Sequence, residues 1–198
     1  MGDWDEWIGS STRVDDVVDP GQARKMQAVL DRDSSIAVGD VLPLAWHWLY
    51  FHQPVAQHLM GTDGHPALGV NLPAFPLARR MWAGGALQWH APLVAGVSAS
   101  RTSTIRAIER KQGRTGALIF VTIDHDVHQG GTLCVAERQD VVYRDATSTS
   151  GPAPAMPAET TCDYQATWQF DAVSLFRYSA LTFNGHRIHY DVDYVRDV

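Results

Sequence analysis

Residues 117–144 read ALIFVTIDHDVHQGGTLCVAERQDVVYR, two long segments joined by Gly130 and Gly131. Each segment is rich in β-branched residues and alternates partly between apolar and polar side chains, which is the pattern of a half-buried strand. A glycine-containing turn between two such runs favours antiparallel pairing of the strands. This stretch therefore predicts the centre of an antiparallel sheet.

Two similar segments precede this pair and extend the predicted sheet. They are residues 86–97 and 99–112, separated by a turn at Gly96 and followed by a glycine-containing turn at 113–116. The four segments together predict an antiparallel meander. Before them, residues 61–85 carry glycine and proline throughout, so we expect a long ordered loop there.

The N-terminal part of the chain predicts one helix and leaves one segment open. Asp19 followed by Pro20 is typical of a helix start, and the apolar residues that follow predict an amphipathic helix over 19–33. Residues 41–60 are rich in aromatics and histidine and are interrupted by Pro54, a pattern that fits either a buried strand or a helix.

A boundary follows the predicted meander. Residues 145–160 have the proline and small-residue content of a linker. Beyond it we expect a new strand over 162–170 and a short helix over 171–182, capped by Asp171 or Ser174. The sequence ends before this second unit has enough elements to close a core, so we expect a truncated chain or one completed from elsewhere.

Composition narrows the classes of function. The chain has 198 residues and a formal net charge of −6, so phosphate-driven binding of nucleic acid is not expected. Its two cysteines do not make a disulfide framework or a zinc knuckle, which favours a reducing compartment. The acidic N-terminus does not resemble a signal peptide, and no apolar run approaches the ~20 residues of a membrane span. We therefore expect a cytoplasmic protein with no membrane partner.

Polar side chains concentrate in residues 181–191, LTFNGHRIHYD. The His186-x-x-His189 spacing suits a metal, with Asp191 or Asp193 as an oxygen ligand, but no third nitrogen or sulfur ligand lies at a familiar spacing, so no metal is expected. These residue types suit the hydration of a double bond conjugated to a thioester, which needs an acid, a base and donors to the enolate oxygen. Asn184 and His189 can face one cleft if the chain turns at Gly185.

The longer stretch RYSALTFNGHRIHYD, residues 177–191, resembles the signature of MaoC-like, hotdog-fold (R)-specific enoyl-acyl hydratases. Its form is most similar to the double-hotdog branch that contains mesaconyl-C4-CoA hydratase, itaconyl-CoA hydratase and type 2 3-hydroxyacyl-thioester dehydratase. The resemblance places His189 at the catalytic histidine and Asn184 where the wider family has a catalytic aspartate. Because an amide cannot act as a general base, it implies that proton transfer falls mainly on His189.

Residues 79–93, 114–127 and 135–145 resemble the first hotdog of that branch. The resemblance implies an α+β class with a hotdog fold, an antiparallel sheet wrapped on a helix, in a double-hotdog arrangement whose second hotdog is truncated. The implied domains are an N-terminal hotdog with an acyl-CoA tunnel at 1–146, a linker at 147–160, and the start of the second hotdog at 161–198.

The implied function is a hydratase or dehydratase that adds or removes water across the α,β double bond of a short-chain enoyl-CoA, including dicarboxylic acyl groups of the mesaconyl or itaconyl type. The substrate is acyl-CoA and no cofactor is expected. His189 is expected to act as acid and base, with Asn184 positioning the water. Further candidate substrate contacts are Arg79, Arg80, Trp82, His186 and Arg187.

Alternatives remain open at this point. One is a non-catalytic hotdog module that binds acyl-CoA or a partner subunit. Another is a 3-hydroxyacyl-ACP dehydratase, which differs only in the carrier and the acyl length. For any of these, a homo-oligomer or a complementing second hotdog is the expected protein partner.

Overall fold

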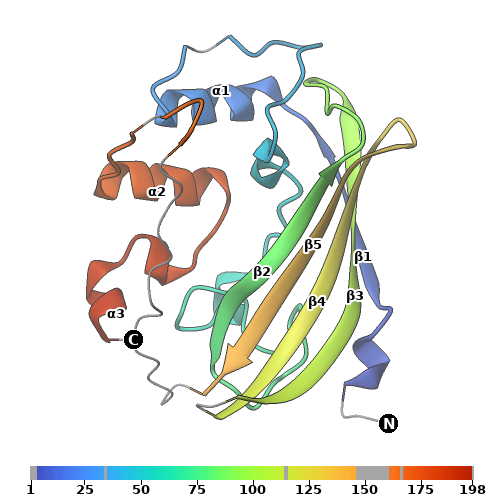
Figure 1. Ribbon diagram of the computed structural model, residues 1–198, viewed down its shortest axis with the longest axis vertical. Coiled ribbons are helices and arrows are strands. Elements are labelled where there is room, and N and C mark those ends of the chain that lie inside the picture. The colour runs from blue at the N-terminus through green and yellow to red at the C-terminus, as the bar shows by residue number, and fades with distance from the viewer. Residues whose placement is uncertain (1–3, 34, 114–115, 146–160, 166, 198) are drawn as a thin grey trace.

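One layer of the molecule is a five-stranded antiparallel sheet in the order β1-β3-β4-β5-β2 (Figure 1). The computed structural model describes residues 4–33, 35–113, 116–145, 161–165 and 167–197. The strands are β1 (Ser11–Val17), β2 (Arg79–Trp89), β3 (Ser98–Gly113), β4 (Gly116–Gln129) and β5 (Thr132–Arg144). The α-helices are α1 (Pro20–Val29), α2 (Ala172–Leu181) and α3 (Val192–Asp197), and short 3-10 helices cover Asp5–Trp7, Trp46–Leu49, Gln57–Leu59 and Arg187–His189.

The predicted hairpin of residues 117–144 is confirmed as β4 and β5. Its turn is closed by the pair Gln129↔Thr132, and both intervening glycines have positive φ angles of 57° and 83°. β3 pairs with β4 along most of its length, as expected of a meander. The predicted α+β class is therefore observed, with the sheet as its largest element.

The two edges of the sheet differ from the prediction. β1 was not expected, yet it pairs with β3 from Ser11↔Thr104 onward. β2 begins at Arg79 and ends at Trp89, so part of the predicted loop 61–85 is strand. A bulge between Trp82 and Gly84 interrupts the alternation of apolar and polar residues in β2, so the local sequence does not show a strand. The pairing of β2 with β5 stabilises the strand instead. Most of the strand predicted over 86–97 is instead loop.

The predictions around the expected linker have mixed outcomes. Residues 146–160, which hold almost all of the predicted linker, lie outside the described part of the chain. The strand predicted over 162–170 is wrong: the described residues of that segment form no strand and pair with none. Residues 41–60 are neither one strand nor one helix and contain two short 3-10 helices, in keeping with the interruption at Pro54.

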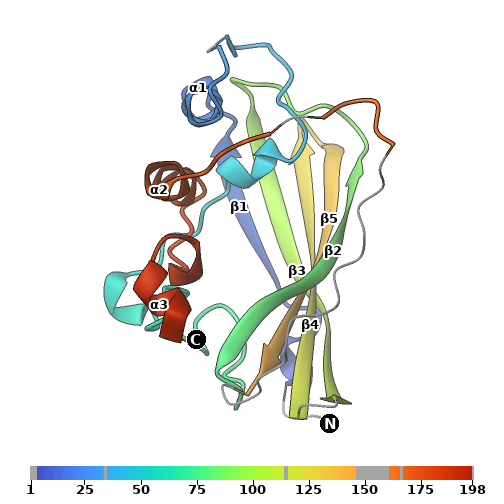
Figure 2. The same cartoon turned by 60° about the vertical axis from the view of Figure 1, so that its left-hand side comes forward.

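The three helices lie on one side of the sheet (Figure 2). Asp19 caps α1 by accepting a hydrogen bond from Gly21 N at 2.9 Å. Asp171 and Ser174 form a reciprocal capping box at the start of α2, as the sequence predicted. A hydrogen bond links α1 to α2, in which the side-chain amide of Gln22 donates to the carbonyl of Leu181 at 2.9 Å. In the described ranges, none of the helices has the length and apolar character needed to cross a bilayer.

Two apolar clusters occupy opposite ends of the sheet face that meets the helices. One joins α1 and the segment Leu49–Phe51 to Val127 and Val135. The other joins Phe75 to strand residues such as Val121 and Tyr143. Between these clusters, every second residue of the central strands is polar instead of apolar, because side chains that share a face recur with period two. We call these residues the polar band: Arg101, Ser103, His125, Glu137 and Gln139.

Candidate functional site

The loop that follows α2 carries the residues with the strongest sequence signal. Phe183 takes a positive φ of 50° and reverses the chain, and Asn184 N then donates to Ser179 O at 2.8 Å. The side-chain oxygen of Asn184 accepts from His186 N at 3.1 Å. Because that oxygen is engaged, the amide nitrogen of Asn184 is the group left to donate to a ligand.

Gly185 is needed for a different reason from the one the sequence suggested. It has no positive φ; instead, a Cβ at this position would lie 2.8 Å from the carbonyl oxygen of Gly64. The reverse contact is closer still, since a Cβ on Gly64 would lie 1.9 Å from the carbonyl oxygen of Gly185. Arg187 N also donates to Asp63 O at 2.9 Å. The loop is thus held against residues 61–65 by a close backbone contact.

This contact assembles a group of side chains that we call the histidine cluster: Asp63, His65, His186 and His189. His65 Nδ1 lies 3.0 Å from the Asp63 carboxylate, and the rings of His65 and His186 are 3.9 Å apart between centroids. The His189 ring contacts His186 edge-on at 5.6 Å. Donor atoms of Asp63, His65 and His186 lie within 4.8 Å of one another, and these residue types can hold a metal ion.

Burial and neighbouring positive charge favour the neutral forms of His65 and His186 by lowering their pKa values. Burial, followed by the proximity of His65, lowers the pKa of His186 to about 4. Burial and the charge of Arg80 lower the pKa of His65. Burial alone would raise the pKa of Asp63, but the hydrogen bonds from His65 bring it below its usual value. A neutral imidazole next to an ionised carboxylate is able to accept a proton.

Two cavities border this cluster, and a third adjoins both of them. Asn184 lines a cavity of about 460 Å³ whose other walls are largely apolar, among them Phe176, Phe183 and Tyr190. His65 lines this cavity and a second one of about 530 Å³ that also contains Arg80. A third cavity, of about 900 Å³, lies over the polar band and shares Arg80 with the second.

The structure brings some of the predicted site residues together and separates others. Asn184 lies in a cavity wall, and His186 is buried in the histidine cluster. His189 is exposed and is not among the residues lining the Asn184 cavity. Arg79 and Arg80 both line the second cavity, but from strand β2, not from a loop.

Two predicted substrate contacts have structural partners instead. Arg187 pairs with Asp191 at 2.8 Å, lies over the Tyr194 ring and donates to Thr62 O, so it fastens the loop. Trp82 is 60% exposed, contacts Trp48 edge-on, and lines none of the three cavities. The prediction that these two bind substrate gains no support from their positions.

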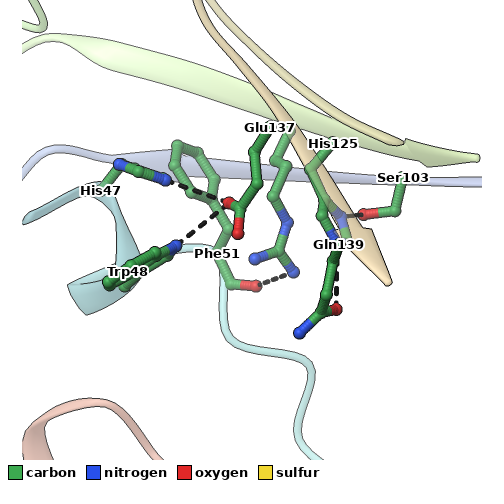
Figure 3. A network of polar contacts seen from close by, with 8 residues as sticks. His47, Trp48, Phe51, Ser103, His125, Glu137 and Gln139 are labelled. Atoms are coloured by element: carbon green, nitrogen blue, oxygen red, sulfur yellow. Dashed lines mark hydrogen bonds and ion pairs between the residues drawn. The ribbon is translucent and has the colours of Figure 1, made fainter. Parts of the chain in front are cut away.

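The sequence did not reveal the polar band (Figure 3), nor Asp63 and His65 of the histidine cluster. One oxygen of Glu137 accepts from Trp48 Nε1 at 3.0 Å and lies 3.2 Å from His47 Nε2. His125 lies between Ser103 Oγ at 2.7 Å and Gln139 Oε1 at 3.4 Å. The signal that identifies the band is the polar residue at every second position of otherwise apolar strand faces, which becomes visible once the strands are aligned in register.

Comparison with known proteins gives consistent matches. A family model for hydroxyacyl-thioester dehydratase type 2 matches residues 45–198. The mesaconyl-C(4)-CoA hydratase of Chloroflexus aurantiacus is 41% identical over 199 residues, covering 98% of this chain and 70% of that protein. The mitochondrial hydroxyacyl-thioester dehydratase type 2 of Schizosaccharomyces pombe is 24% identical over 177 residues, covering 75% of this chain and 57% of that protein.

Solved structures agree on the fold. A MaoC-like dehydratase superposes with a TM-score of 0.60 at 14% identity, covering 96% of this chain and 70% of that chain. At this identity the likeness concerns the fold alone, and it confirms the predicted hotdog.

Proposed function

Because this chain belongs to the hydroxyacyl-thioester dehydratase type 2 family of MaoC-like hotdog proteins, we propose that it adds or removes water across the α,β double bond of an enoyl-CoA. The observation that carries the proposal is the loop after α2. This loop places Asn184 in the wall of a largely apolar cavity, and its His189 ring contacts the ring of the buried His186. An apolar cavity beside a few convergent polar groups is the usual form of a small-molecule site.

In the proposed reaction, His189 transfers the proton and Asn184 positions the water. The amide nitrogen of Asn184 is free to donate, because its oxygen is held by His186 N. An amide cannot take a proton from water, so the acid and base roles fall on an imidazole. His186 supports His189 through the ring contact and is itself kept neutral by burial.

We propose that the acyl group is short and enters the cavity next to Asn184. The relative from Chloroflexus aurantiacus acts on mesaconyl-C(4)-CoA, by its name, and a dicarboxylic acyl group of that kind is our proposed substrate class. Arg79 and Arg80 are the proposed contacts for an anionic part of the substrate, since both line the second cavity and Arg80 lines the third. A second hotdog subunit or a second copy of the chain is the proposed protein partner.

Hydration of mesaconyl-C4-CoA, followed by loss of absorbance of the conjugated thioester, tests this function. We expect turnover by the wild type and a loss of about 10²- to 10⁴-fold in kcat for His189→Ala, the range of a general acid–base group. His58→Ala is the matched control, because His58 is exposed and lines none of the three cavities. Equal rates for the wild type and His189→Ala would contradict the role of His189.

A second candidate is an acyl-CoA binding module without turnover. It is favoured by the exposed position of His189 outside the wall of the Asn184 cavity. The same assay separates the two functions. Tight thioester binding with no hydration of mesaconyl-C4-CoA or crotonyl-CoA would support the binding module.

A further inference from the structure

The cavity of about 900 Å³ over the polar band contains a cation, Arg101, to which the proposed function assigns no role. Three arginines and one aspartate line it, and the pair Arg13–Asp15 neutralises one of those arginines at 2.8 Å. Arg80 and Arg101 remain, and within the described residues neither forms an ion pair with a carboxylate. The cavity therefore carries a surplus of positive charge.

Arg101 is the deeper of these cations and is incompletely satisfied. It projects from near the start of β3, donates to the carbonyl of Phe51 at 2.9 Å and lies over the Phe51 ring at 5.8 Å. Its Nε is buried and has no hydrogen-bond partner. Burial lowers the pKa of Arg101, which records the cost of holding this cation away from water. An anion that pairs with the guanidinium would offset this cost.

The neighbouring groups leave room for an anion. The charge of Glu137 raises the pKa of Arg101, but among the described residues the two form no ion pair, and His47 and Trp48 both contact one oxygen of the Glu137 carboxylate. Gln139 presents an oxygen to His125, so its amide nitrogen is available as a further donor at the cavity wall. A guanidinium donates charge-assisted hydrogen bonds to a carboxylate, and an amide nitrogen can donate a further one.

The cavity adjoins the proposed reaction site. Gln53 and Val55 line both the Asn184 cavity and the cavity over the band. His52 stacks on Phe183, the residue before Asn184, at 5.7 Å and also lines the cavity over the band. The Asn184 cavity and the cavity that holds Arg101 are therefore neighbours with walls in common.

We propose that Arg101 is a specificity-determining residue that binds the distal carboxylate of a dicarboxylic acyl group in the cavity over the polar band. This inference rests on the proposed function and deepens it, because it names the residue that selects a charged over an uncharged acyl chain. The half-buried guanidinium forms charge-assisted hydrogen bonds to the carboxylate.

Calorimetric binding of two saturated thioesters tests the assignment without any need for turnover. Succinyl-CoA carries a distal carboxylate and butyryl-CoA a methyl group in its place, while the CoA phosphates are identical. We expect the wild type to bind succinyl-CoA about 10- to 100-fold more tightly, the range of charge-assisted hydrogen bonds. Arg101→Gln, which keeps a donor for Phe51 O, is expected to lose this preference, and Arg101→Lys to retain part of it.

Arg106→Gln is the matched control, since Arg106 lies on the same strand but is exposed and paired with Asp124 at 2.6 Å. This control should keep the preference for succinyl-CoA, and thermal unfolding checks that all variants fold. Equal binding of both thioesters by the wild type, binding of neither, or a preference that survives Arg101→Gln overturns the assignment. Equal weakening of both thioesters by Arg101→Gln also overturns it, because the anion would then be a CoA phosphate.

The two proposals fail separately. If the wild type hydrates no enoyl thioester but prefers succinyl-CoA in an Arg101-dependent way, the proposed function is wrong and the carboxylate site stands. If mesaconyl-C4-CoA is hydrated and the preference for succinyl-CoA is absent, the reverse holds.

Discussion

The histidine cluster and the polar band both place imidazole near an acid, but they are built differently. In the band, Ser103, His125 and Glu137 lie directly opposite one another on three adjacent strands. In the cluster, His65 and His186 come from two loops that are held by the approach of two glycines and one backbone hydrogen bond. Sheet register therefore fixes the band, whereas the cluster depends on how two loops dock.

This difference assigns separate tasks to the two regions. Side chains on paired strands have little freedom, which suits the selection of a ligand by shape and charge. A cluster between loops adjusts more easily, and loops on a rigid scaffold commonly carry reactive groups. Substitutions that remove a hydrogen-bond partner in the band should therefore lower the free energy of unfolding. Substitutions in the two loops should instead separate the residues of the histidine cluster.

The largest effect is expected for Glu137→Ala. It leaves the buried His47 and the indole of Trp48 without their acceptor, and each buried polar group left unsatisfied costs about 1–3 kcal/mol. Urea unfolding measures the loss. Glu137→Gln is the control, because its amide oxygen can still accept one of the two hydrogen bonds and a smaller loss is expected. An unchanged free energy of unfolding for Glu137→Ala would show that the band is not a structural unit.

The next effect concerns pH and the cluster. The pKa of His186 is lowered from 6.5 to about 4, so between these values the unfolded chain binds a proton that the native protein does not. Stability should therefore fall as pH is lowered from about 6.5 to 4, by up to about 3 kcal/mol at 1.4 kcal/mol per pKa unit. Urea unfolding at a series of pH values measures this loss.

His186→Asn should flatten the pH dependence in that window. The other groups of the cluster, Asp63, His65 and His189, are unchanged in the variant, so the difference between the two curves reports His186. Parallel curves for the wild type and His186→Asn would mean that the native and unfolded states bind protons at this position equally.

The sequence made the central sheet and both helix starts predictable, and the reasons are local. The glycine turn at 130–131 and the caps Asp19 and Asp171 act within a few residues of the chain, and each was confirmed. β1 and the first half of β2 were not predicted because their pairing partners, β3 and β5, lie far along the chain. Tertiary pairing decides such segments more than their own composition does.

The candidate site was predictable in one half only. The loop with Asn184, His186 and His189 was visible as a dense polar stretch. Its partners Asp63 and His65 were not, because more than a hundred residues separate the two loops and only the contact between Gly64 and Gly185 joins them. The polar band was missed for a related reason. A single polar residue in a strand does not indicate a site until the residues opposite it on the neighbouring strands are known.

A smaller loss is expected for Gly64→Ala. Gly64 has a φ of 87°, and the added Cβ would lie 1.9 Å from the backbone of Gly185, so the loops must separate. We expect a loss of about 2 kcal/mol together with reduced hydratase activity. Gly39→Ala is matched in φ, at 94°, with no atom within 4 Å of its Cβ, and should show only the cost of the backbone conformation. Equal effects of the two substitutions would mean that the loops do not need this contact.

The smallest effect is expected at the start of α2, the helix that delivers Asn184 to its cavity. Asp171→Ala removes the side chain that accepts from Ser174 N at 2.8 Å, and loss of such a cap costs about 1 kcal/mol. Asp163→Ala is the control for net charge, since Asp163 is exposed and precedes the helix. Because the cap lies at the opposite end of α2 from Asn184, the loss should appear in thermal unfolding while the KM for an enoyl-CoA stays unchanged. A raised KM in Asp171→Ala alone would show instead that the position of the loop depends on the whole of α2. The contact between the two loops would then not be sufficient to hold the histidine cluster in place.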